Sequence, residues 1–431
     1  MEVGPDRPDA RPSPGHPAPG DGNGDGDGGT RLAELELHDV RAFAEATFRP
    51  APDGLTVLTG PNGSGKTTIL EAIAFLGTHR SFRSADREAM VRTGADQAMV
   101  RSRFVREGRP LTVESELVRG RAPRTLVNRR PVSTRTALAE AVPVTVFSPE
   151  DLTVVQGPPA RRRDLLDGAI RLLDHRAAAD LDVLDRVLRQ RAALLRQAGG
   201  RLTAEIETTL DVWDARLSET GSRVVAARRS LADALGPEVV RAYADLACGN
   251  GAAAAAAGAG EAGSARPGEA AGVAAVLSAE EAVEEAAGVP APAGAAVQIG
   301  YRPSWEGPLD QALAERRADD VRRGVSTVGP HRDDLALALD GRDARTQASQ
   351  GEQRSIALAL RLAVHRLVTA QLGWAPILLL DDVFSELDPA RSRALVRHLP
   401  AGQAVLTTAG PLPDGADVAV VVDVRSLSAE R

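Results

Sequence analysis

The sequence predicts an α/β fold in which buried parallel strands end at a phosphate-binding edge. Two observations carry this prediction. Residues 55–59 read as a buried strand, the glycine-rich run 60–67 follows directly, and residues 68–76 place apolar side chains at helical spacing. Near the other end of the chain, residues 377–380 are four aliphatics that lead into two aspartates. A strand, a glycine turn and a helix, together with a strand that ends in acids, are typical of α/β proteins that bind nucleoside triphosphates.

The glycine-rich run fits the pattern G-x-x-x-x-G-K-[ST] without a mismatch. Its glycines allow backbone N–H groups to surround phosphates, and the helix that follows adds the positive end of its dipole. Lys66 is expected to reach the β- and γ-phosphates, and the Thr67 hydroxyl to hold Mg²⁺. The residues expected to bind the nucleotide are Gly60, Pro61, Asn62, Gly63, Ser64, Gly65, Lys66, Thr67 and Thr68.

Lys66 is the only lysine among the 52 basic residues of the chain, so the other 51 are arginines. A sequence that otherwise uses arginine keeps a slim ammonium at the one place where a planar guanidinium would not fit the loop. This choice strengthens the assignment of a phosphate-binding loop.

Composition sets the remaining limits. The chain has 431 residues, a formal net charge of −7 and one cysteine, Cys248. A mildly acidic chain must contact nucleic acid, if at all, through a local basic face. A single cysteine excludes an intramolecular disulfide and suits a reducing cytosol. There is no run of about 18 apolar residues, so we expect a cytoplasmic protein without a membrane span.

The predicted organisation is a nucleotide-binding unit split by a helical lobe. Residues 1–29 read as a disordered tail, and an Ala-, Gly- and Glu-rich insertion within the lobe reads as flexible. The expected divisions are 1–29 for the tail, 30–157 and 321–431 for the two parts of the nucleotide-binding unit, and 158–320 for the helical lobe with its insertion at 249–295.

Apolar spacing places the remaining elements. Leucines that share one face between residues 181 and 195 predict a helical arm too short for a long coiled coil. Trp213 and Leu217 share a helix face and are expected in the core. The expected strands are 32–37, 100–104, 111–118, 124–127, 142–147 and 297–301, with a turn at 128–131, and the expected helices are 158–247, 309–323 and 355–368.

The start of the helix before the acidic strand has two interpretations. Ser349, with Glu352 three residues later, forms a capping-box pattern that can simply begin a helix. It can also be a second phosphate-binding helix N-terminus. Because the chain already has a phosphate loop, we infer that this second one serves a partner molecule. The polar turn 385–389 directly follows the acidic strand, and we expect it at the same interface as this helix start.

Two arginine-rich segments also have two interpretations each. Residues 80–83, Arg-Ser-Phe-Arg, are either a solvated loop or a contact to nucleotide or nucleic acid. Arg161, Arg162 and Arg163 are either a solvated helix start or a contact to DNA phosphates, which a cluster of cations favours.

Together these segments resemble the ABC-type ATPase heads of the SMC class and, within it, the RecF family of recombination-repair proteins. The Gly-Pro-His-Arg-Asp-Asp and Ser-Pro-Glu-Asp-Leu strings are more specific than the phosphate loop. The segments that carry the resemblance, spread over about 32–425, are 41–43, 66–73, 80–83, 147–152, 161–163, 190–195, 328–334 and 380–388.

The resemblance implies an ABC-type P-loop head with a compact, mainly helical second lobe and no long coiled coil. Two copies are expected to close head-to-tail on ATP. Each would lend its signature (Ser349, Gly351, Glu352) and its D-loop (Ser385, Asp388) to the partner's nucleotide. Arg41 is expected near the nucleotide, and Glu150 and Asp151 in a loop that senses the γ-phosphate. Asp381, through water and with Thr67, is expected to hold Mg²⁺, and Asp382 to orient the attacking water.

The same resemblance implies the function. The closed dimer is expected to bind double-stranded DNA near single-stranded gaps and to act with RecR and RecO, and indirectly with RecA, in recombinational repair and replication restart. The implied enzyme is a weak, DNA-stimulated ATPase that uses Lys66, Asp381 and Asp382.

Two departures leave alternatives. The signature has Ala348 and Gln350 where ABC transporters carry leucine and glycine, and Thr407-Thr408 stands after the last expected sheet strand where a histidine is usual. Both suggest slow hydrolysis. The alternatives are the ATPase subunit of a membrane transporter, whose signature and histidine are missing, and a nucleotide-dependent scaffold that does not hydrolyse ATP. The paired acids argue against the scaffold, but Thr407 at the position of the usual histidine keeps this alternative open.

Overall fold

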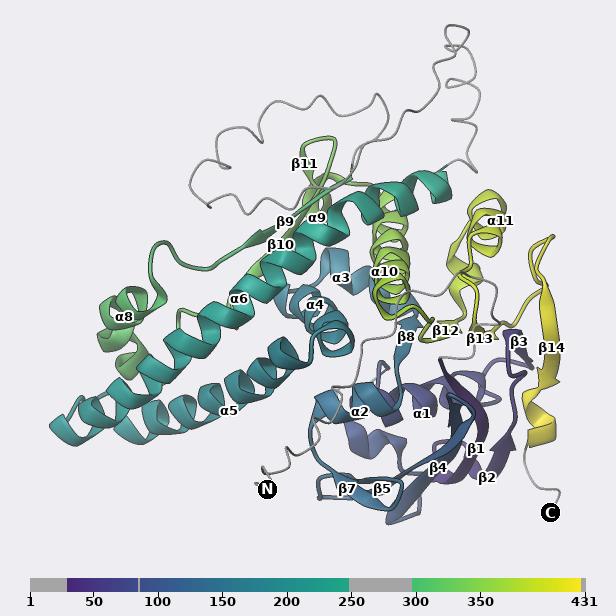
Figure 1. Ribbon diagram of the computed structural model, residues 1–431, viewed down its shortest axis with the longest axis horizontal. Helices are drawn as coiled ribbons and strands as arrows, with labels where there is room; N and C mark the ends of the chain where they lie inside the picture. Colours follow the sequence, from purple (N-terminus) through teal and green to yellow (C-terminus); the bar gives the residue numbers. More distant parts are fainter. Residues whose placement is uncertain (1–28, 84–85, 248–296, 428–431) are drawn as a thin grey trace, which may run out of the picture.

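A computed structural model describes residues 29–83, 86–247 and 297–427 of the chain. The expected tail, apart from residue 29, and the expected insertion at 249–295 lie outside these ranges. The chain forms a sheet-rich head, at the lower right of Figure 1, and a helical lobe that extends away from it. The head is built from both ends of the chain, as the sequence predicts.

The centre of the head is a five-stranded parallel sheet with the order β14-β3-β13-β12-β8. Every residue of β12 and β13 is buried, because helices cover both faces of the sheet. This burial explains why β12 reads as an uninterrupted apolar run rather than an alternating one. The strands are β3 (Gly54–Thr59), β8 (Val144–Phe147), β12 (Ile377–Asp381), β13 (Gln403–Thr407) and β14 (Val418–Asp423).

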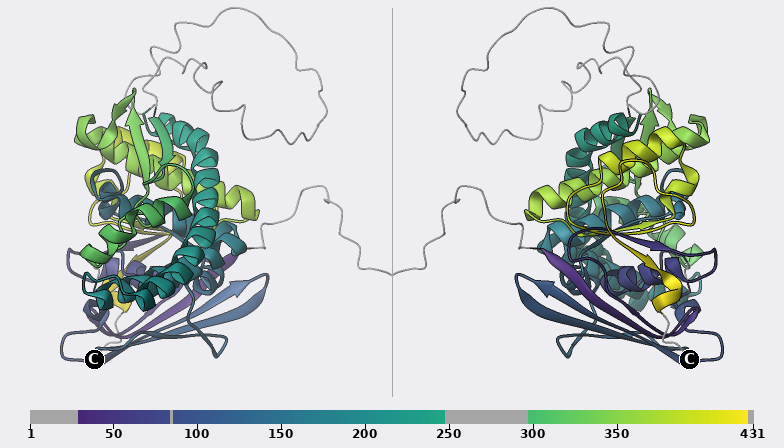
Figure 2. Two further views of the ribbon diagram at one scale, coloured as in Figure 1. Left: turned by 90° about the vertical axis from the view of Figure 1, so that its left-hand side faces the viewer. Right: turned by 90° about the vertical axis from the view of Figure 1, so that its right-hand side faces the viewer.

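A second, antiparallel sheet forms an outer layer of the head, visible at the bottom of both views in Figure 2. Its order is β2-β1-β4-β5-β6-β7, and it confirms the strands expected in the first part of the chain. The expected turn at 128–131 is shorter, because β7 already begins at Arg130. The strands are β1 (Thr30–Val40), β2 (Phe43–Phe48), β4 (Gln97–Arg106), β5 (Arg109–Val118), β6 (Arg124–Val127) and β7 (Arg130–Val132).

Helix α1 (Lys66–Thr78) packs between the two sheets. Ile69 and Ile73 share one buried cluster with Val100 of the antiparallel sheet and with Leu379 of the parallel sheet. Gly77 allows the closest approach, since a Cβ there would lie 2.3 Å from the carbonyl oxygen of Val142. Helix α1 is therefore packed closely between the two sheets along its length.

The helical lobe extends from the head as a pair of helices that lie side by side, α5 (His175–Ala198) and α6 (Ala204–Ala247). At about 1.5 Å per residue, the 24 residues of α5 span about 36 Å. The arm is therefore short, as expected. Leu217 is fully buried and Trp213 is half-buried against the same core, which confirms their expected place. The other helices of this lobe are α3 (Leu152–Gln156), α4 (Pro159–Leu173) and α8 (Leu309–Arg323).

The boundary expected at residue 320 does not coincide with the end of a structural element. It falls inside α8, and it separates β9 (Val297–Arg302) from its hydrogen-bonded partner β10 (Asp334–Leu339). These strands form a small third sheet with β11 (Arg342–Asp343). The expected boundary missed this pairing because β9 and β10 are well separated in the sequence, and composition alone does not show which strands pair.

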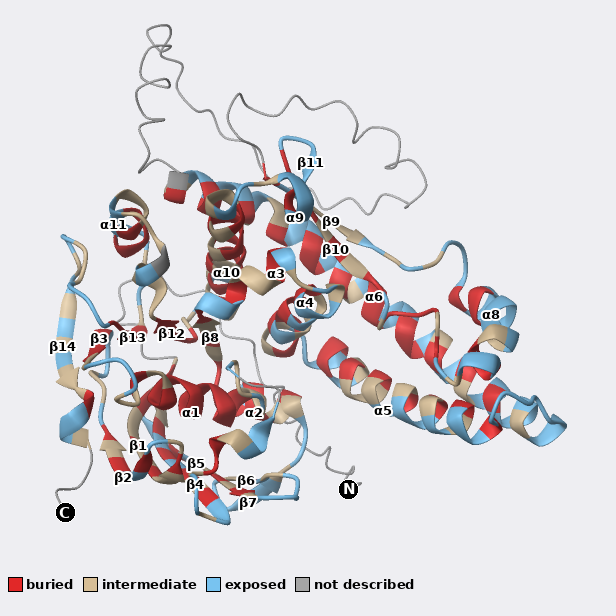
Figure 3. Cartoon of the chain, turned by 180° about the vertical axis from the view of Figure 1, so that it is seen from behind, coloured by how far each residue is buried: buried red, intermediate tan, exposed pale blue. Residues whose placement is uncertain are grey.

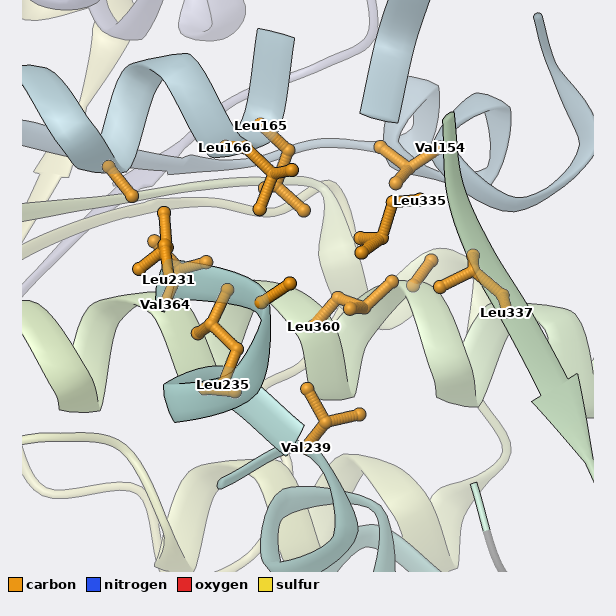
Figure 4. Close-up of a cluster of buried hydrophobic side chains, with 14 of the residues drawn as sticks. Val154, Leu165, Leu166, Leu231, Leu235, Val239, Leu335, Leu337, Leu360 and Val364 are labelled. Carbon is orange, nitrogen blue, oxygen red and sulfur yellow. The ribbon is translucent and has the colours of Figure 1, made fainter. Parts of the chain in front are cut away.

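The two lobes share one core around α10 (Gln350–Leu372), which is mostly buried in Figure 3. Figure 4 shows how five elements converge there. The labelled side chains are Val154 of α3, Leu165 and Leu166 of α4, Leu231, Leu235 and Val239 of α6, Leu335 and Leu337 of β10, and Leu360 and Val364 of α10.

The remaining elements are short. They are α2 (Arg135–Ala141), α9 (Ala344–Gln347) and α11 (Pro389–Arg397), with 3₁₀ turns at Arg87–Met90, Pro149–Asp151, Val383–Glu386 and Val424–Leu427.

Within the described ranges, α10 is the one helix long and apolar enough to cross a membrane, with a mean hydropathy of 1.2 over the best window. More than half of that window, 56%, is buried inside the protein. The helix packs against α6 and the parallel sheet, so its hydropathy reflects its place in the core.

A buried arginine joins three helices of the arm. Arg191 of α5 is fully buried, and its guanidinium lies 2.6 Å from Asp214 of α6 and 2.7 Å from Asp320 of α8. It also donates to the Ser326 hydroxyl at 2.7 Å. A buried charge of this kind is stable only while its partners remain.

Replacing Arg191 with alanine should lower the free energy of unfolding by about 3–5 kcal/mol, because Asp320 is left buried and unpaired. Urea unfolding followed by circular dichroism measures the change. Arg189→Ala, at an exposed position of the same helix, is the matched control and should shift stability by less than about 0.5 kcal/mol. Equal effects of the two substitutions would show that the buried network does not hold the arm.

Candidate functional site

The loop between β3 and α1 adopts the backbone that phosphate binding requires. Gly60, Gly63 and Gly65 have φ of 142°, 79° and 102°, a region that other residues rarely adopt. A Cβ on Gly65 would also lie 2.6 Å from the ring of Phe43. No side chain caps the N-terminus of α1 at Gly65, so its first N–H groups stay available to an anion.

Lys66 folds back over its own loop. Its Nζ donates to the carbonyl oxygens of Gly60 at 2.7 Å and Pro61 at 3.0 Å. The Ser64 hydroxyl is buried and has no hydrogen-bond partner within the described part of the chain. An ammonium held by neutral carbonyls and an unsatisfied buried hydroxyl both fit a loop that a phosphate group completes.

The acidic strand reaches the same place. Asp381, the last residue of β12, accepts hydrogen bonds at 2.8 Å from the hydroxyls of both Thr67 and Thr407. Burial raises the pKa of the Asp381 carboxyl, although the two hydroxyl bonds oppose the change. The sequence thus anticipated that Thr67 and Asp381 meet, across 314 residues of chain.

The donor set fits Mg²⁺ in the manner of phosphate-loop enzymes. Thr67 and Asp381 supply one hydroxyl and one carboxylate, and no group of three His, Cys, Asp or Glu side chains elsewhere in the described ranges could hold a metal. Mg²⁺ commonly takes one or two protein oxygens and completes its octahedron with phosphates and water. These two residues could hold the ion only together with a nucleotide.

Asp382 lies beside this pair. Its N–H donates to the Thr407 hydroxyl at 2.9 Å, and its φ of 47° places it in the left-handed region. A hollow of about 400 Å³ contains Asp382 and Thr407 and is lined further by Arg41, Asn62, Gly63, Gly65, Lys66, Thr67 and Thr68. That volume lies in the range of about 300–1,000 Å³ typical of small-molecule sites.

Thr407 is a positioning residue that the sequence analysis treated only as a departure from histidine. Its hydroxyl donates to Asp381 and accepts from the backbone of Asp382, so it fixes both acids. Thr407 ends β13, and one more strand, β14, follows it in the chain. The signal available beforehand was a hydroxyl residue at the end of a buried strand, next to the acids.

Arg41 lines the nucleotide hollow, as expected, and its guanidinium is paired with a carboxylate of α1. It bonds both carboxylate oxygens of Glu71, at 3.0 and 2.6 Å. Glu71 is fully buried on α1 and also accepts from the Ser81 hydroxyl. Sequence reasoning gave Glu71 no role, although a carboxylate on the buried face of α1 must be paired.

The signature helix begins as expected. The Ser349 hydroxyl accepts from the N–H of Glu352 at 3.3 Å, and the Glu352 carboxylate accepts from the N–H of Ser349 at 2.7 Å. This capping box lowers the pKa of Glu352. Neither residue, nor Gly351, belongs to the described lining of the nucleotide hollow. Loop and signature are separate sites within one chain.

The D-loop residues support the local fold. The Ser385 hydroxyl donates to the carbonyl oxygen of Asp382 at 2.8 Å. Asp388 caps α11 by accepting from two of its N–H groups, at 3.0 and 2.9 Å. A role toward a partner's nucleotide stays a prediction for both.

The segment after β8 is fastened to the signature helix. Asp151 accepts from Arg361 of α10 at 2.7 Å, and Gln156 donates to Gln353 of the same helix at 2.6 Å. Glu150 is exposed. A sensing role for Glu150 and Asp151 stays a prediction. The two hydrogen bonds connect this segment directly to α10.

The three arginines at the start of α4 do not form one surface. Arg162 is buried, pairs with Asp334 at 2.6 Å, and donates to three carbonyl oxygens at the C-terminal end of the preceding helix, α3. Arg163 is half-buried and donates to the carbonyl oxygen of Asp333. Arg161 alone is exposed. A DNA contact from Arg162 is therefore withdrawn, because its guanidinium is already used in the core.

Amine labelling can test the loop directly, since Lys66 is the chain's only lysine. ATP with Mg²⁺, at 100-fold above its Kd, should slow modification of Lys66 by about 100-fold, because the bound phosphates engage the ammonium. Mass spectrometry of the peptide gives the rate, with the α-amino group as internal reference. Lys66→Ala should lose ATP binding. An unprotected Lys66 at saturating ATP would contradict the assignment.

Comparison with known proteins agrees with this geometry. The family model described as "RecF/RecN/SMC N terminal domain" matches residues 31–407. A curated protein from Beutenbergia cavernae, named "DNA replication and repair protein RecF", is 40% identical over 397 residues, with 89% of this chain and 94% of the relative covered. One of the same name from Frankia alni is 40% identical over 383 residues, with 88% and 93% covered.

Among solved structures, "Structure of the recombination mediator protein RecF-ATP in RecFOR pathway" superposes with a TM-score of 0.72 at 23% identity. The match covers 89% of this chain and 92% of that one. A second structure, described as "RecF-ATPrS", gives a TM-score of 0.71 at 23% identity, covering 91% and 98%. The expected ABC-type head with a compact helical lobe is therefore confirmed.

Proposed function

This chain belongs to the RecF family, and we propose on that premise that it is an ATP-dependent DNA-binding clamp of recombinational repair and replication restart. Two copies close head-to-tail on ATP. The closed dimer holds double-stranded DNA near single-stranded gaps, and opening follows hydrolysis.

One observation carries the clamp proposal. The phosphate loop and Asp382 line one hollow, and Asp381 bonds the loop residue Thr67, whereas Ser349, Gly351 and Glu352 lie outside the described lining. The N-terminus of α10 is exposed and has no phosphate loop of its own, so we assign it to the partner's nucleotide. In a two-fold dimer, any contact from one signature to the partner's loop is made twice.

Hydrolysis would use the chain's own groups in distinct roles. Lys66 would bind the β- and γ-phosphates, and Asp382 would orient the attacking water. Thr67 and Asp381 would hold Mg²⁺, which neutralises charge on the transferring phosphate. Thr407 would keep both acids in place. We propose that the activity is weak and stimulated by DNA.

The partners are proposed from the relatives. The curated relatives are named DNA replication and repair proteins, and a similar solved structure is described as a recombination mediator of the RecFOR pathway. The RecFOR pathway in the second name supports RecO and RecR as partners. We propose further that they help to load RecA, and that the protein works in the cytoplasm. The names also leave the transporter alternative without support.

Asp382→Asn should bind ATP and dimerise, yet hydrolyse it far more slowly, because the amide cannot activate water as a carboxylate does. Phosphate release under single-turnover conditions measures hydrolysis, and sedimentation measures the trapped dimer. Asp310→Asn, at an exposed position of α8 outside the hollow, the signature and the D-loop, is the matched control. Unchanged hydrolysis in Asp382→Asn, or none in the unmodified protein, would favour a non-hydrolysing scaffold.

Ser349→Arg should leave ATP binding by the single chain intact and block closure, because a bulky cation replaces the helix cap. Mixing it with Lys66→Ala provides a sharper test. A head-to-tail pair of these two variants still contains one intact loop facing one intact signature. The mixture should therefore regain ATPase activity that neither variant has alone. No recovery, or loss of ATP binding by Ser349→Arg, would contradict the trans arrangement.

A further inference from the structure

A second hollow of about 600 Å³, open to solvent, lies beyond the C-terminal end of α1. Arginines from three separate segments line it: Arg80, Arg83 and Arg87 after α1, Arg135 at the start of α2, and Arg161 at the start of α4. We call these five residues the arginine pocket. Both arginine-rich segments that the sequence left open thus meet at one place.

The pocket is short of negative charge. Its lining includes two carboxylates, Glu150 and Asp164, against five arginines, and Asp164 already pairs with Arg80 at 2.6 Å. Within the described ranges, Arg87, Arg135 and Arg161 form no ion pair. Other arginines of the chain, among them Arg162, Arg191 and Arg228, pair with aspartates.

Neighbouring groups report the same excess of positive charge. The pKa of the His79 imidazole is lowered to about 4, first by burial and then by Arg87 and Arg135. His79 is therefore neutral at pH 7 and adds no charge. Burial, and next Arg80, also lower the pKa of the half-buried Arg135. A cluster of unpaired cations in this setting is stabilised by a bound polyanion.

The arginine pocket is distinct from the nucleotide hollow, with which it shares only Arg83 in the described lining of the two. We propose that the arginine pocket binds the phosphodiester backbone of duplex DNA held by the closed dimer. The inference rests on the proposed DNA clamp and gives it a contact surface. Guanidinium groups pair with phosphate oxygens in a fork, and several together release condensed counterions from the duplex.

The test is the salt dependence of duplex binding by the full chain with ATP and Mg²⁺, measured by fluorescence anisotropy. The variant Arg87→Ala/Arg135→Ala/Arg161→Ala leaves Arg83, and with it the nucleotide hollow, unchanged. Three lost phosphate contacts should reduce the slope of log K against log salt by about 2–3. The matched control, Arg109→Ala/Arg121→Ala/Arg130→Ala, removes three exposed arginines of the antiparallel sheet and should leave the slope unchanged.

Two further variants protect the test from misfolding. Arg87→Ala/Arg161→Ala changes only exposed positions and should still lower the slope by about 2. Replacing all three residues with lysine keeps the charge and should keep most of the slope.

Each contrary outcome is distinguishable. Equal slopes for the pocket variant and the unmodified protein would overturn the arginine pocket and leave the clamp standing. A raised KM for ATP with an unchanged DNA slope would show that the pocket takes nucleotide phosphates instead. No duplex binding by the unmodified protein at any salt concentration would overturn the proposed clamp as well.

Discussion

Two hydroxyl groups that hold one carboxylate organise the nucleotide site. Thr67 lies in the first turn of α1, Thr407 ends β13, and both donate to Asp381 at the end of β12. This arrangement ties α1 to two strands near the other end of the chain. Without it, the paired acids would not face the phosphate loop. Because the two hydroxyls are uncharged, the negative charge of the carboxylate remains available to a cation. Burial at this place raises the pKa of Asp381.

Contacts between the two lobes connect the parallel sheet of the nucleotide site to the helix that carries the signature. Asp151 and Gln156 fasten the segment after β8 to α10 through Arg361 and Gln353. A movement of this segment on nucleotide binding would therefore carry the signature helix with it. The proposed clamp thus needs no long coiled coil, since a short arm and one shared core already connect the loop and the signature surface.

The sequence predicted the local features well, because glycine spacing, apolar runs and capping boxes are local physical signals. The loop at 60–67, the strand before Asp381 and the cap at Ser349 all form as expected. It failed where pairing is long-range. The partners of Glu71, the burial of Arg162 and the pairing of β9 with β10 depend on residues brought together only by the fold. An arginine triplet in sequence therefore did not amount to an arginine surface.

The central claim is closure of two chains on ATP around DNA. Sedimentation velocity of the full chain without nucleotide, with ADP, or with ATP, each with and without a gapped duplex, tests it most directly. The account predicts a monomer that becomes a dimer only with ATP and then retains the duplex. A chain that remains monomeric in saturating ATP and sediments apart from the DNA would contradict it.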